Sequence, residues 1–332
     1  MRIAINGFGR IGKTFLRTIL FDKSALKKIE VAAINLGPAD KKLVAHQFKY
    51  DTLMGIYPGN VALEGDFLVI DGLRIAIIAE SNAELLPWKK LEIDWVVDCS
   101  GHYTKREKAE QHLKAGAKKV LISAPASGDD VTIIPGVNSD AYDAQKHAIV
   151  SLGSCTTNAF LPMLKVLDEN FGLKKIFMTT THAYTNTQVL LDVDIGDARR
   201  SRAAALNIVP STTGATSTVG KVLPHLADMV QGMSIRVPVA KVSLLDVTFE
   251  AKKDVSAALL NEAFEKASSG KLRGILSTTK EELVSSDFSG NPHSVIVDET
   301  LTQAMGTMGK VFGWYDNEWG YSERLKDFLL HL

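Results

Sequence analysis

A glycine pattern close to the N-terminus constrains the fold more than any other feature of the sequence. Gly7, Gly9 and Gly12 follow the strand-like run Arg2–Asn6 and open the helical pattern Arg10–Phe21. In this context the first glycine permits a tight turn, the second lets the backbone approach a pyrophosphate, and the third lets helix and strand pack closely. The N–H groups at the helix N-terminus favour phosphates. The pattern therefore predicts dinucleotide binding, with an ordinary glycine-rich turn as the alternative.

Strand and helix patterns alternate through the first half of the chain. Continuous apolar strands separated by helices indicate a parallel sheet that is covered on both faces. We therefore expect an α/β fold with a Rossmann-type doubly wound parallel sheet in residues 1–153. A further helix is expected at Lys105–Ala115. The further strands are expected at Val31–Asn35, Ile75–Ala79, Trp95–Asp98, Val120–Ile122 and Ala148–Ser151.

The second half has longer strand patterns with more polar residues, as a sheet with one open face would have. We expect an α+β catalytic domain with a mixed, largely antiparallel sheet in residues 154–317, and a C-terminal helix, residues 318–332, that belongs to the first domain. Asp254 is expected to cap a helix, and Tyr184–Pro210 shows no periodic pattern. The strand patterns are Lys174–His182, Met233–Val237 and Val242–Phe249.

Composition and charge exclude several classes of function. The 332 residues include 38 basic and 38 acidic ones, so no net charge favours nucleic acid or an anionic membrane surface. The apolar runs are too short to span a bilayer, and the early glycine pattern leaves no room for a secretory signal. Two cysteines are too few for a disulfide framework. We expect a cytoplasmic protein with no metal site, no membrane association and no nucleic-acid partner.

Cys155 lies where a helix is expected to begin, and His182 ends a strand pattern. A helix N-terminus lowers the pKa of a thiol through its dipole and free N–H groups, and the same groups can hold an oxyanion. An imidazole near the thiolate can act as acid or base. Purely structural roles for both residues stay open, because the sequence does not show that they meet. Cys99 ends an apolar strand and is interpreted as core packing.

The expected nucleotide site lacks one common element. An acidic residue usually follows the second strand and accepts hydrogen bonds from the adenosine ribose. This chain has Leu36 at that point, and Lys41 and Lys42 follow it. A carboxylate would repel the 2′-phosphate of NADP, whereas leucine would not. The expected cofactor is therefore NAD or NADP, and the sequence allows the use of both.

Four motifs, in the same order along the whole chain, resemble those of the phosphorylating glyceraldehyde-3-phosphate dehydrogenases. They begin at Ile5, Ser154, His182 and Trp314 and read Ile-Asn-Gly-Phe-Gly-Arg-Ile-Gly, Ser-Cys-Thr-Thr-Asn, His-Ala-Tyr-Thr-Asn and Trp-Tyr-Asp-Asn-Glu-Trp-Gly. The separation of Cys155 from His182, 182 − 155 = 27, is also that of the family. One such motif is suggestive, and four in register make the resemblance specific.

The resemblance implies oxidation of D-glyceraldehyde 3-phosphate to 1,3-bisphosphoglycerate in glycolysis or gluconeogenesis. Cys155 would form a hemithioacetal and then a thioester, His182 would take the hydroxyl proton, and inorganic phosphate would release the product. The resemblance also implies a homotetramer in which Tyr184–Pro210 lines a neighbour's cofactor site. The implied substrate- and phosphate-binding residues are Ser154, Thr156, Thr185, Arg200, Thr213, Gly214 and Arg236. The implied cofactor positions are Gly7, Gly9, Arg10, Ile11, Gly12, Leu36, Ser81, Ser100, Ser123 and Asn317.

The chain departs from the family pattern at several positions, most of which concern the cofactor. They are Leu36 in place of an acid, Ser81 in place of a basic residue, Thr187 in place of an aspartate, and Val193 and Asp194 in place of the Leu-Pro pair of strict NAD users. Two other functions stay open. One is erythrose-4-phosphate dehydrogenase, whose members depart from the His-x-Tyr-Thr-Asn pattern that this chain keeps. The other is a non-catalytic binding or scaffolding protein on the same fold.

Overall fold

The computed structural model describes residues 1–331, and the chain divides into two compact units. The last residue of the expected C-terminal helix, Leu332, lies outside the described range. Unit 1 comprises Met1–Ile133, Asp140–Gly153 and Ser322–Leu332, and unit 2 comprises Ile134–Ser139 and Ser154–Tyr321. This division differs from the expected one at residues 134–139 and 318–321, which belong to unit 2.

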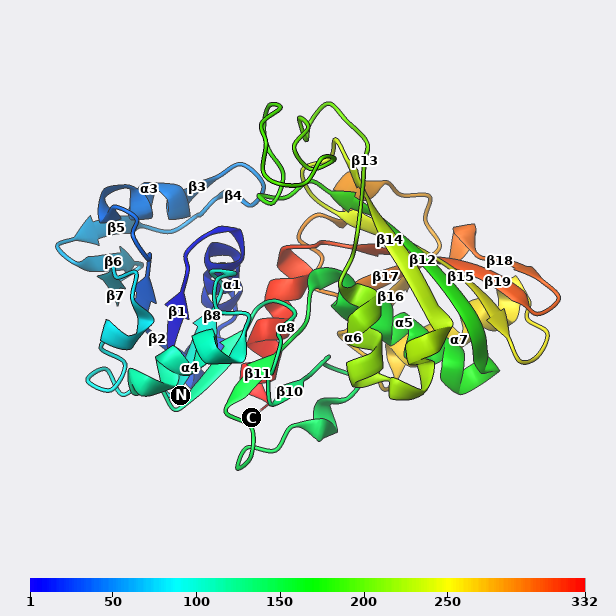
Figure 1. Ribbon diagram of the computed structural model, residues 1–332, viewed down its shortest axis with the longest axis horizontal. Helices are drawn as coiled ribbons and strands as arrows, with labels where there is room; N and C mark the ends of the chain where they lie inside the picture. The colour runs from blue at the N-terminus through cyan, green and yellow to red at the C-terminus, as the bar shows by residue number, and fades with distance from the viewer. Residues whose placement is uncertain (332) are drawn as a thin grey trace. The chain divides into compact units, whose positions relative to one another are not determined.

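Unit 1 is built on one nine-stranded sheet (Figure 1). Seven of its strands run parallel, while β5 and β6 add an antiparallel edge. The chain runs outward from β1 in both directions, which confirms the predicted doubly wound sheet. In spatial order the strands are β10 (Val131–Thr132), β11 (Ile149–Ser151), β9 (Lys119–Ile122), β8 (Trp95–Asp98), β1 (Arg2–Asn6), β2 (Glu30–Asn35), β7 (Leu73–Ile78), β6 (Phe67–Ile70) and β5 (Val61–Glu64).

The core of unit 1 forms around β1 and the first helix. Ile3 and Ile5 of β1, the central strand of the sheet, are fully buried. Phe15, Leu16 and Ile19 lie on one face of the helix and are also fully buried. The helices of unit 1 are α1 (Arg10–Phe21), α2 (Ala25–Lys28), α3 (Val44–Lys49), α4 (Arg106–Lys114) and most of α8 (Trp319–Leu330), and a small sheet pairs β3 (Tyr50–Asp51) with β4 (Gly55–Ile56).

The edge hairpin of β5 and β6 was not expected from the sequence. Gly65 and Gly72, both with positive φ, turn the chain on either side of β6. Glycine supplies this backbone conformation without steric cost, so the two turns let three short strands pair side by side. The 3-10 helices of the chain are η1 (Lys41–Leu43), η2 (Ala83–Leu85), η3 (Ser139–Ala141), η4 (Pro224–Met229), η5 (Ser285–Phe288) and η6 (Glu299–Leu301).

Unit 2 contains one eight-stranded sheet. Five of its strand pairings are antiparallel and two are parallel, which confirms the predicted mixed, largely antiparallel sheet. In spatial order the strands are β13 (Val209–Ser211), β14 (Val230–Val237), β12 (Leu173–Ala183), β15 (Ser243–Ala251), β19 (Met308–Tyr315), β17 (Val295–Asp298) and β16 (Leu276–Thr279), with β18 (Gln303–Met305) paired to β19.

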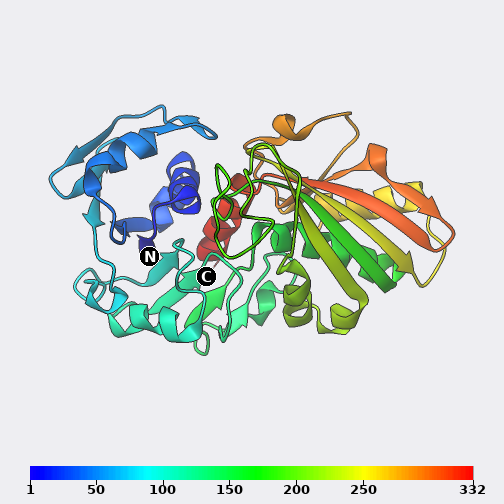
Figure 2. The same ribbon diagram turned by 45° about the horizontal axis from the view of Figure 1, so that its top comes forward.

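Helices cover one face of the unit 2 sheet (Figures 1 and 2). They are α5 (Cys155–Phe171), α6 (Ala215–Val222) and α7 (Ala257–Ser269). Phe160 and Leu164 of α5 join Ile176 of β12 in the fully buried core. The neighbouring position on β12, Phe177, is 64% exposed, and Met233 on β14 is 44% exposed. The sheet therefore has one buried and one open face, as its alternating pattern predicts.

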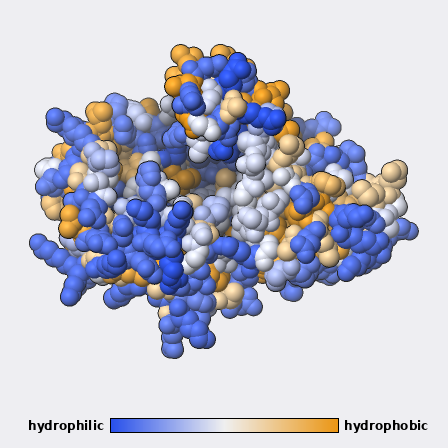
Figure 3. All heavy atoms as spheres, viewed as in Figure 1, coloured by the Kyte–Doolittle hydropathy of each residue, from blue (hydrophilic) through white to orange (hydrophobic). Residues whose placement is uncertain are grey.

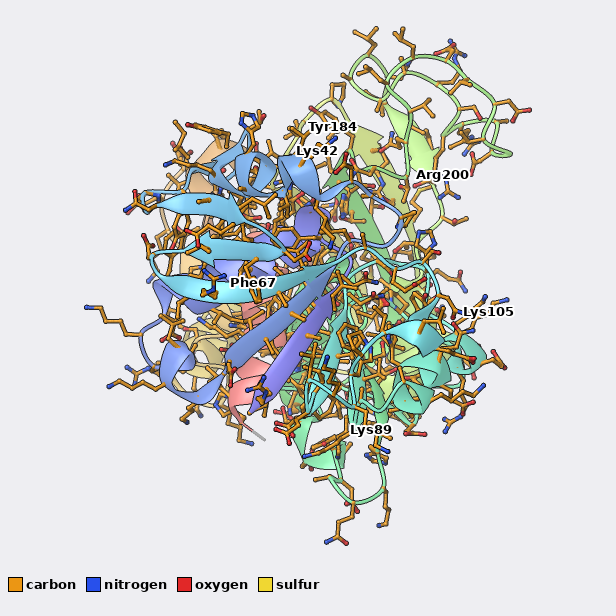
Figure 4. All side chains as sticks on the ribbon, turned by 90° about the vertical axis from the view of Figure 1, so that its left-hand side faces the viewer. Lys42, Phe67, Lys89, Lys105, Tyr184 and Arg200 are labelled. Carbon is orange, nitrogen blue, oxygen red and sulfur yellow. The ribbon has the colours of Figure 1, made fainter. Side chains whose placement is uncertain are left out.

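The cap of α7 and the Tyr184–Pro210 segment can be compared with the expectations from the sequence. The predicted cap Asp254 was wrong, because Ser256 is extended and its side chain accepts a hydrogen bond from the Leu259 N–H at the start of α7. The Tyr184–Pro210 segment stands out from the strands that it connects, as Figures 1 and 4 show. It consists mainly of turns and bends up to the start of β13.

The glycines between β1 and α1 are required by contacts within unit 1. Gly7 has φ +89°, and a Cβ there would lie 2.6 Å from the Ser100 Cα. A Cβ at Gly12 would lie 2.2 Å from the Gly7 carbonyl oxygen, whereas a Cβ at Gly9 would meet nothing within 4 Å. The fold therefore requires glycine at the first and third positions, whereas the space beside Gly9 is empty.

Alanine substitutions should separate these roles. We expect Gly12→Ala to lower the free energy of unfolding by about 1–3 kcal/mol, the usual cost of overpacking. The matched variant Gly9→Ala should cost less than about 1 kcal/mol, since only an N-cap preference changes. Denaturant unfolding measures both, and equal losses would contradict the steric argument.

Candidate active site and nucleotide cavity

Cys155 is the first residue of α5. Ser154 caps this helix in an extended conformation, and its Oγ accepts a hydrogen bond from the Thr157 N–H at 3.1 Å. The Thr157 hydroxyl accepts in turn from the Ser154 N–H at 3.4 Å. This capping box determines where the helix starts. The cysteine thus lies in the first turn, where free N–H groups and the helix dipole act on it.

His182 approaches Cys155 from the end of β12. Its side chain is almost fully buried, and its Nε2 lies 3.6 Å from the Cys155 Sγ. Parallel pairing of β12 with β14 sets Arg236 directly beside His182 in the sheet. The Arg236 Nη1 lies 2.8 Å from the His182 Nδ1. The structure therefore brings a thiol, an imidazole and a guanidinium together within unit 2.

Burial dominates the electrostatics of this group. It raises the pKa of the Cys155 thiol, although the charge of Arg236 and hydrogen bonds at the start of α5 oppose this effect. Burial, followed by the charge of Arg236, lowers the pKa of His182 to about 3. For Cys155 this direction is opposite to the lowering expected for a thiol at a helix N-terminus, because desolvation outweighs the charge of Arg236 and the hydrogen bonds at the start of α5.

A buried hydroxyl group adjoins the pair. The Tyr315 hydroxyl lies 3.0 Å from the Thr156 Oγ1 and 2.7 Å from the Thr180 Oγ1. Its ring packs edge-on against His182, with 5.9 Å between the centroids. Burial raises the pKa of Tyr315, so the phenol stays protonated. This tyrosine lies in one of the four motifs, but no role was expected for it from the sequence. Its hydroxyl is hydrogen-bonded to that of Thr156, the residue that follows the cysteine.

Two arginines expected to bind phosphate lie close enough to interact. The charge of Arg200 contributes to lowering the pKa of Arg236. The Arg236 Nε is buried and has no hydrogen-bond partner within residues 1–331. Arg200 pairs with Asp197 at 2.8 Å, and the Thr185 hydroxyl lies 2.9 Å from that of Thr187. A donor without an acceptor, beside a second cation, suits an oxyanion ligand.

Two other expected phosphate residues lie at the start of α6, which packs against α5. Gly214 is the N-cap of α6, and the Thr213 Oγ1 accepts a hydrogen bond from the Ala215 N–H at 3.2 Å. The Ser154 hydroxyl is engaged in the cap of α5. The starts of both helices thus carry N–H groups and hydroxyls, which are donors suited to an anion.

Unit 1 contains a cavity of about 540 Å³ at the carboxyl ends of its parallel strands. Ligands bind at this edge of a doubly wound sheet. Five expected cofactor positions line the cavity, namely Gly7, Gly9, Leu36, Ser81 and Ser100. The backbone at Gly9 is open, and the first turn of α1 carries no acidic side chain. These features fit the pyrophosphate of a dinucleotide.

Other expected cofactor positions lie elsewhere. Arg10, Ile11, Gly12 and Ser123 do not line the cavity. Arg10 forms an ion pair with Asp51. Asn317 belongs to unit 2, where its Oδ1 accepts a hydrogen bond from the Val242 N–H at 3.1 Å. This bond determines which way the Asn317 amide faces.

A buried polar network that was not expected from the sequence lies beside this cavity. Asn35 donates to the Asn6 Oδ1 at 2.8 Å, and Asn6 donates to the Asp98 Oδ2 at 3.3 Å. Asp98 also accepts from the Ser100 hydroxyl at 2.8 Å. The signal was a polar residue at the carboxyl end of three apolar strands, β1, β2 and β8. Asp40, also missed, adds a carboxylate to the cavity lining.

No group of three or more histidine, cysteine, aspartate or glutamate side chains in the described part of the chain is arranged to hold a metal ion. Over the same residues, every helix is too short or too polar to cross a membrane.

The fold and the site together indicate a class of protein, the dinucleotide-dependent dehydrogenases. Residues 1–106 match the model of the glyceraldehyde 3-phosphate dehydrogenase NAD binding domain, and residues 154–317 match that of the C-terminal domain. The chain belongs to the glyceraldehyde 3-phosphate dehydrogenase family, which confirms the resemblance seen in its motifs.

The similarity to individual proteins extends over almost the full chain. Glyceraldehyde-3-phosphate dehydrogenase 2 of Streptomyces avermitilis is 49% identical over 329 residues, which cover 98% of this chain and 97% of that protein. Glyceraldehyde-3-phosphate dehydrogenase 2 of Bacillus subtilis is 44% identical over 333 residues, covering 100% and 96%. Glyceraldehyde-3-phosphate dehydrogenase of Geobacillus stearothermophilus is also 44% identical over 333 residues, covering 100% and 98%.

The two cysteines should differ in reactivity. Cys99, expected in the core, in fact lines the nucleotide cavity, and burial and the charge of Asp98 raise its pKa. Burial also raises the pKa of Cys155, but Arg236 opposes it. We therefore expect iodoacetamide to modify Cys155 first at neutral pH, at a rate that increases with pH as the thiolate forms. Mass spectrometry of the wild type and of Cys99→Ala measures this, and preferential modification of Cys99 would contradict the assignment.

Proposed function

We propose that this protein oxidises glyceraldehyde 3-phosphate and couples the oxidation to phosphorylation, with NAD or NADP as hydride acceptor. The observation that carries the proposal is the Cys155 Sγ at the start of α5, 3.6 Å from the His182 Nε2. Sulfur suits this reaction because a thioester conserves the energy of aldehyde oxidation for transfer to phosphate. The related proteins are glyceraldehyde-3-phosphate dehydrogenases by name. The product, 1,3-bisphosphoglycerate, would serve glycolysis or gluconeogenesis.

The residues of unit 2 would act in sequence. Cys155 forms a bond to the aldehyde carbon while its proton passes to the aldehyde oxygen, which gives a hemithioacetal, and N–H groups at the start of α5 stabilise that oxygen. His182 accepts the hydroxyl proton as the carbon is oxidised to a thioester. The bound nicotinamide supplies the hydride acceptor for that step. Inorganic phosphate then attacks the thioester carbon, and Cys155 leaves as the thiolate.

Two oxyanions must be held near the sulfur during this sequence. We assign the substrate phosphate to Thr185 and Arg236, because the Arg236 Nε is a buried donor without an acceptor among the described residues. Arg200, whose charge acts on Arg236, would bridge the two anions. We assign the attacking phosphate to the donors at the starts of α5 and α6, which are Ser154, Thr156, Thr213 and Gly214.

The cofactor would be held by the glycine turn and the cavity of unit 1. Its pyrophosphate would lie on the N–H groups at the start of α1, next to Gly9. Leu36 lines the cavity where an acid is common, so NADP is tolerated as well as NAD. Asn317 would orient the nicotinamide carboxamide through its amide nitrogen, because its Oδ1 is already bonded to the Val242 N–H.

We further propose that the protein is a homotetramer. The Tyr184–Pro210 segment exposes a series of apolar side chains, and Figure 3 shows apolar atoms over this segment. Exposed clusters of this kind mark association surfaces. The exposed residues are Leu190 (81%), Leu191 (70%), Val193 (58%), Ile195 (47%), Leu206 (78%) and Ile208 (70%).

A reducing compartment suits the proposed chemistry. Both cysteines, Cys99 and Cys155, are free thiols. Thiols persist in the cytoplasm, whereas secreted proteins tend to form disulfides. We therefore propose a cytoplasmic location.

The phosphorylating step gives the test of the proposed function. Phosphate or arsenate should be required for multiple turnovers of glyceraldehyde 3-phosphate, because an oxyanion must release the thioester. Cys155→Ser should abolish oxidation while cofactor binding, measured by fluorescence titration, persists. Erythrose 4-phosphate is the control substrate. Rapid turnover without phosphate, above all on this control, would favour erythrose-4-phosphate dehydrogenase instead.

Position 36 should control the choice of cofactor. Leu36→Asp places a carboxylate in the cavity, which would bond to the ribose of NAD and repel the 2′-phosphate of NADP. We expect a shift towards NAD of about 1–3 kcal/mol in the ratio of kcat/KM values, the size of a charge-assisted hydrogen bond. In the matched variant Leu36→Asn, the asparagine has the shape of aspartate without its charge, so the cofactor preference should shift less. Strict NAD use by the wild type, unaltered in Leu36→Asp, would show that this position does not contact the ribose.

A further inference from the structure

A buried carboxylate in unit 1, that of Asp98, bonds to two residues of the nucleotide cavity. Asp98 is the last residue of β8 and is almost fully buried. Its Oδ1 accepts hydrogen bonds from the Ser100 N–H at 2.9 Å and from the Ser100 hydroxyl at 2.8 Å. Its Oδ2 accepts from the Asn6 Nδ2 at 3.3 Å. Asn6 and Ser100 both line the cavity, so one buried charge is bonded to two parts of its wall.

A chain of hydrogen bonds with a fixed direction leads to Asp98 from the backbone of Glu80. The Asn35 Nδ2 donates to the Glu80 carbonyl oxygen at 2.9 Å, and the Asn35 Oδ1 accepts from the Glu80 N–H at 3.1 Å. These two bonds determine which way the Asn35 amide faces. Asn35 therefore donates to the Asn6 Oδ1, and Asn6 is left with its own amide N–H for Asp98. The chain ends in a donor.

A second chain leads to Asp98 from the indole of Trp88. An indole N–H can only donate, and this one donates to the His112 Nδ1 at 3.1 Å. Burial lowers the pKa of His112 to about 4, so the imidazole is neutral and its one proton is on Nε2. That Nε2 lies 3.9 Å from the Asp98 Oδ2 and has no hydrogen-bond partner among the described residues. The second chain therefore also ends in a donor beside the carboxylate.

These converging donors favour the ionised form of Asp98. Burial raises the pKa of Asp98, while the bonds from Ser100 and Asn6 oppose this effect. A protonated carboxyl would need an acceptor, and of the neighbouring groups only the Ser100 hydroxyl could become one, by giving up its own bond to Asp98. The negative charge therefore holds both bonds to Ser100. The other titratable groups in electrostatic contact with Asp98 are Cys99, His102 and Tyr103.

The residues after Asp98 form part of the cavity wall. Ser100, His102 and Tyr103 all line the cavity. The Ser100 hydroxyl accepts a hydrogen bond from the His102 N–H at 3.1 Å while it donates to Asp98. The rings of Tyr103 and His112 pack together, with 4.6 Å between their centroids. The conformation of this wall segment thus depends on buried groups that do not themselves line the cavity.

We propose that Asp98 is a positioning residue for the cofactor, whose charge holds the wall segment around Ser100 in the conformation that binds NAD or NADP. The inference rests on the proposed function, since it assumes that the cofactor occupies this cavity. Asp98 acts through Ser100 and does not contact the cofactor. A purely structural aspartate would stabilise the fold without affecting cofactor affinity, and this difference can be measured.

An uncharged residue of the same shape tests the proposal. Asp98→Asn replaces one acceptor oxygen with an amide donor, which then faces other donors. We expect the Kd for NAD, measured by calorimetry, to increase about two- to tenfold, the factor given by one ordinary hydrogen bond. The KM for NAD should increase likewise, while kcat at saturating cofactor is kept.

Asp94→Asn is the matched control, because Asp94 lies before the other end of β8 and does not line the cavity. Its carboxylate accepts from the Arg2 N–H at 2.8 Å and pairs with Lys118 at 2.8 Å. Denaturant unfolding should show a loss of stability in both variants, since each loses bonds to an aspartate. The Kd for NAD should change only in Asp98→Asn.

A double-mutant cycle tests whether Asp98 acts through Ser100. In a Ser100→Ala background the hydroxyl bond is already absent, so Asp98→Asn should raise the Kd by a smaller factor than it does in the wild type. Should Asp98→Asn fail to fold, Ser100→Thr and Ser100→Ala still provide a test. Threonine keeps the hydroxyl that Asp98 holds, so it should bind NAD more tightly than alanine does at this position.

The outcomes separate this proposal from the function beneath it. An unchanged Kd in Asp98→Asn, full additivity in the cycle, or equal affinities of Ser100→Thr and Ser100→Ala overturns the positioning role. If phosphate-dependent oxidation of glyceraldehyde 3-phosphate persists in that case, the proposed function stands. If the wild type binds neither NAD nor NADP, the proposed function itself fails.

Discussion

The parallel pairing of β12 and β14 is the constraint on which the unit 2 site depends. Its register sets His182 beside Arg236, and the backbone hydrogen bonds of eight consecutive residue pairs hold that register. A slip of β14 by one residue would turn the Arg236 side chain to the face of the sheet opposite His182. The packing of α5 over β12 then brings Cys155 to the imidazole. The reacting groups thus come from two strands and one helix, and none depends on a flexible loop for its position.

Local signals in the sequence were enough to locate the cysteine and the histidine, but not to describe their chemistry. A helix start and a strand end are visible as patterns, so Cys155 and His182 could be singled out individually. Their separation of 3.6 Å depends on packing between distant parts of the chain. The predicted lowering of the Cys155 pKa differs from the structure for the same reason. A helix dipole can be inferred from a helix pattern, whereas desolvation, which raises this pKa, depends on the residues that cover the thiol.

The fold of unit 1 could be predicted further than its site. The glycine turn and the alternating strands predicted a doubly wound sheet, which the structure has. The network of Asn6, Asn35 and Asp98 was missed because these residues are far apart in the sequence and become neighbours only through the order of β2, β1 and β8. A single polar residue after an apolar strand looks like an ordinary strand end. Only knowledge of which strands are adjacent shows that three of them meet.

The glycine turn has a consequence for how cofactor preference can change. A side chain at Gly7 would meet the backbone of Ser100, and one at Gly12 would meet the Gly7 carbonyl oxygen, so the backbone proposed to receive the pyrophosphate has almost no freedom to vary. The residues after β2, from Leu36 to Asp40, line the same cavity and include side chains that a point mutation can replace. In the proposed function, phosphate binding depends on this backbone, whereas ribose selection depends on side chains. A point mutation could therefore change the preference between NAD and NADP while the fold is kept.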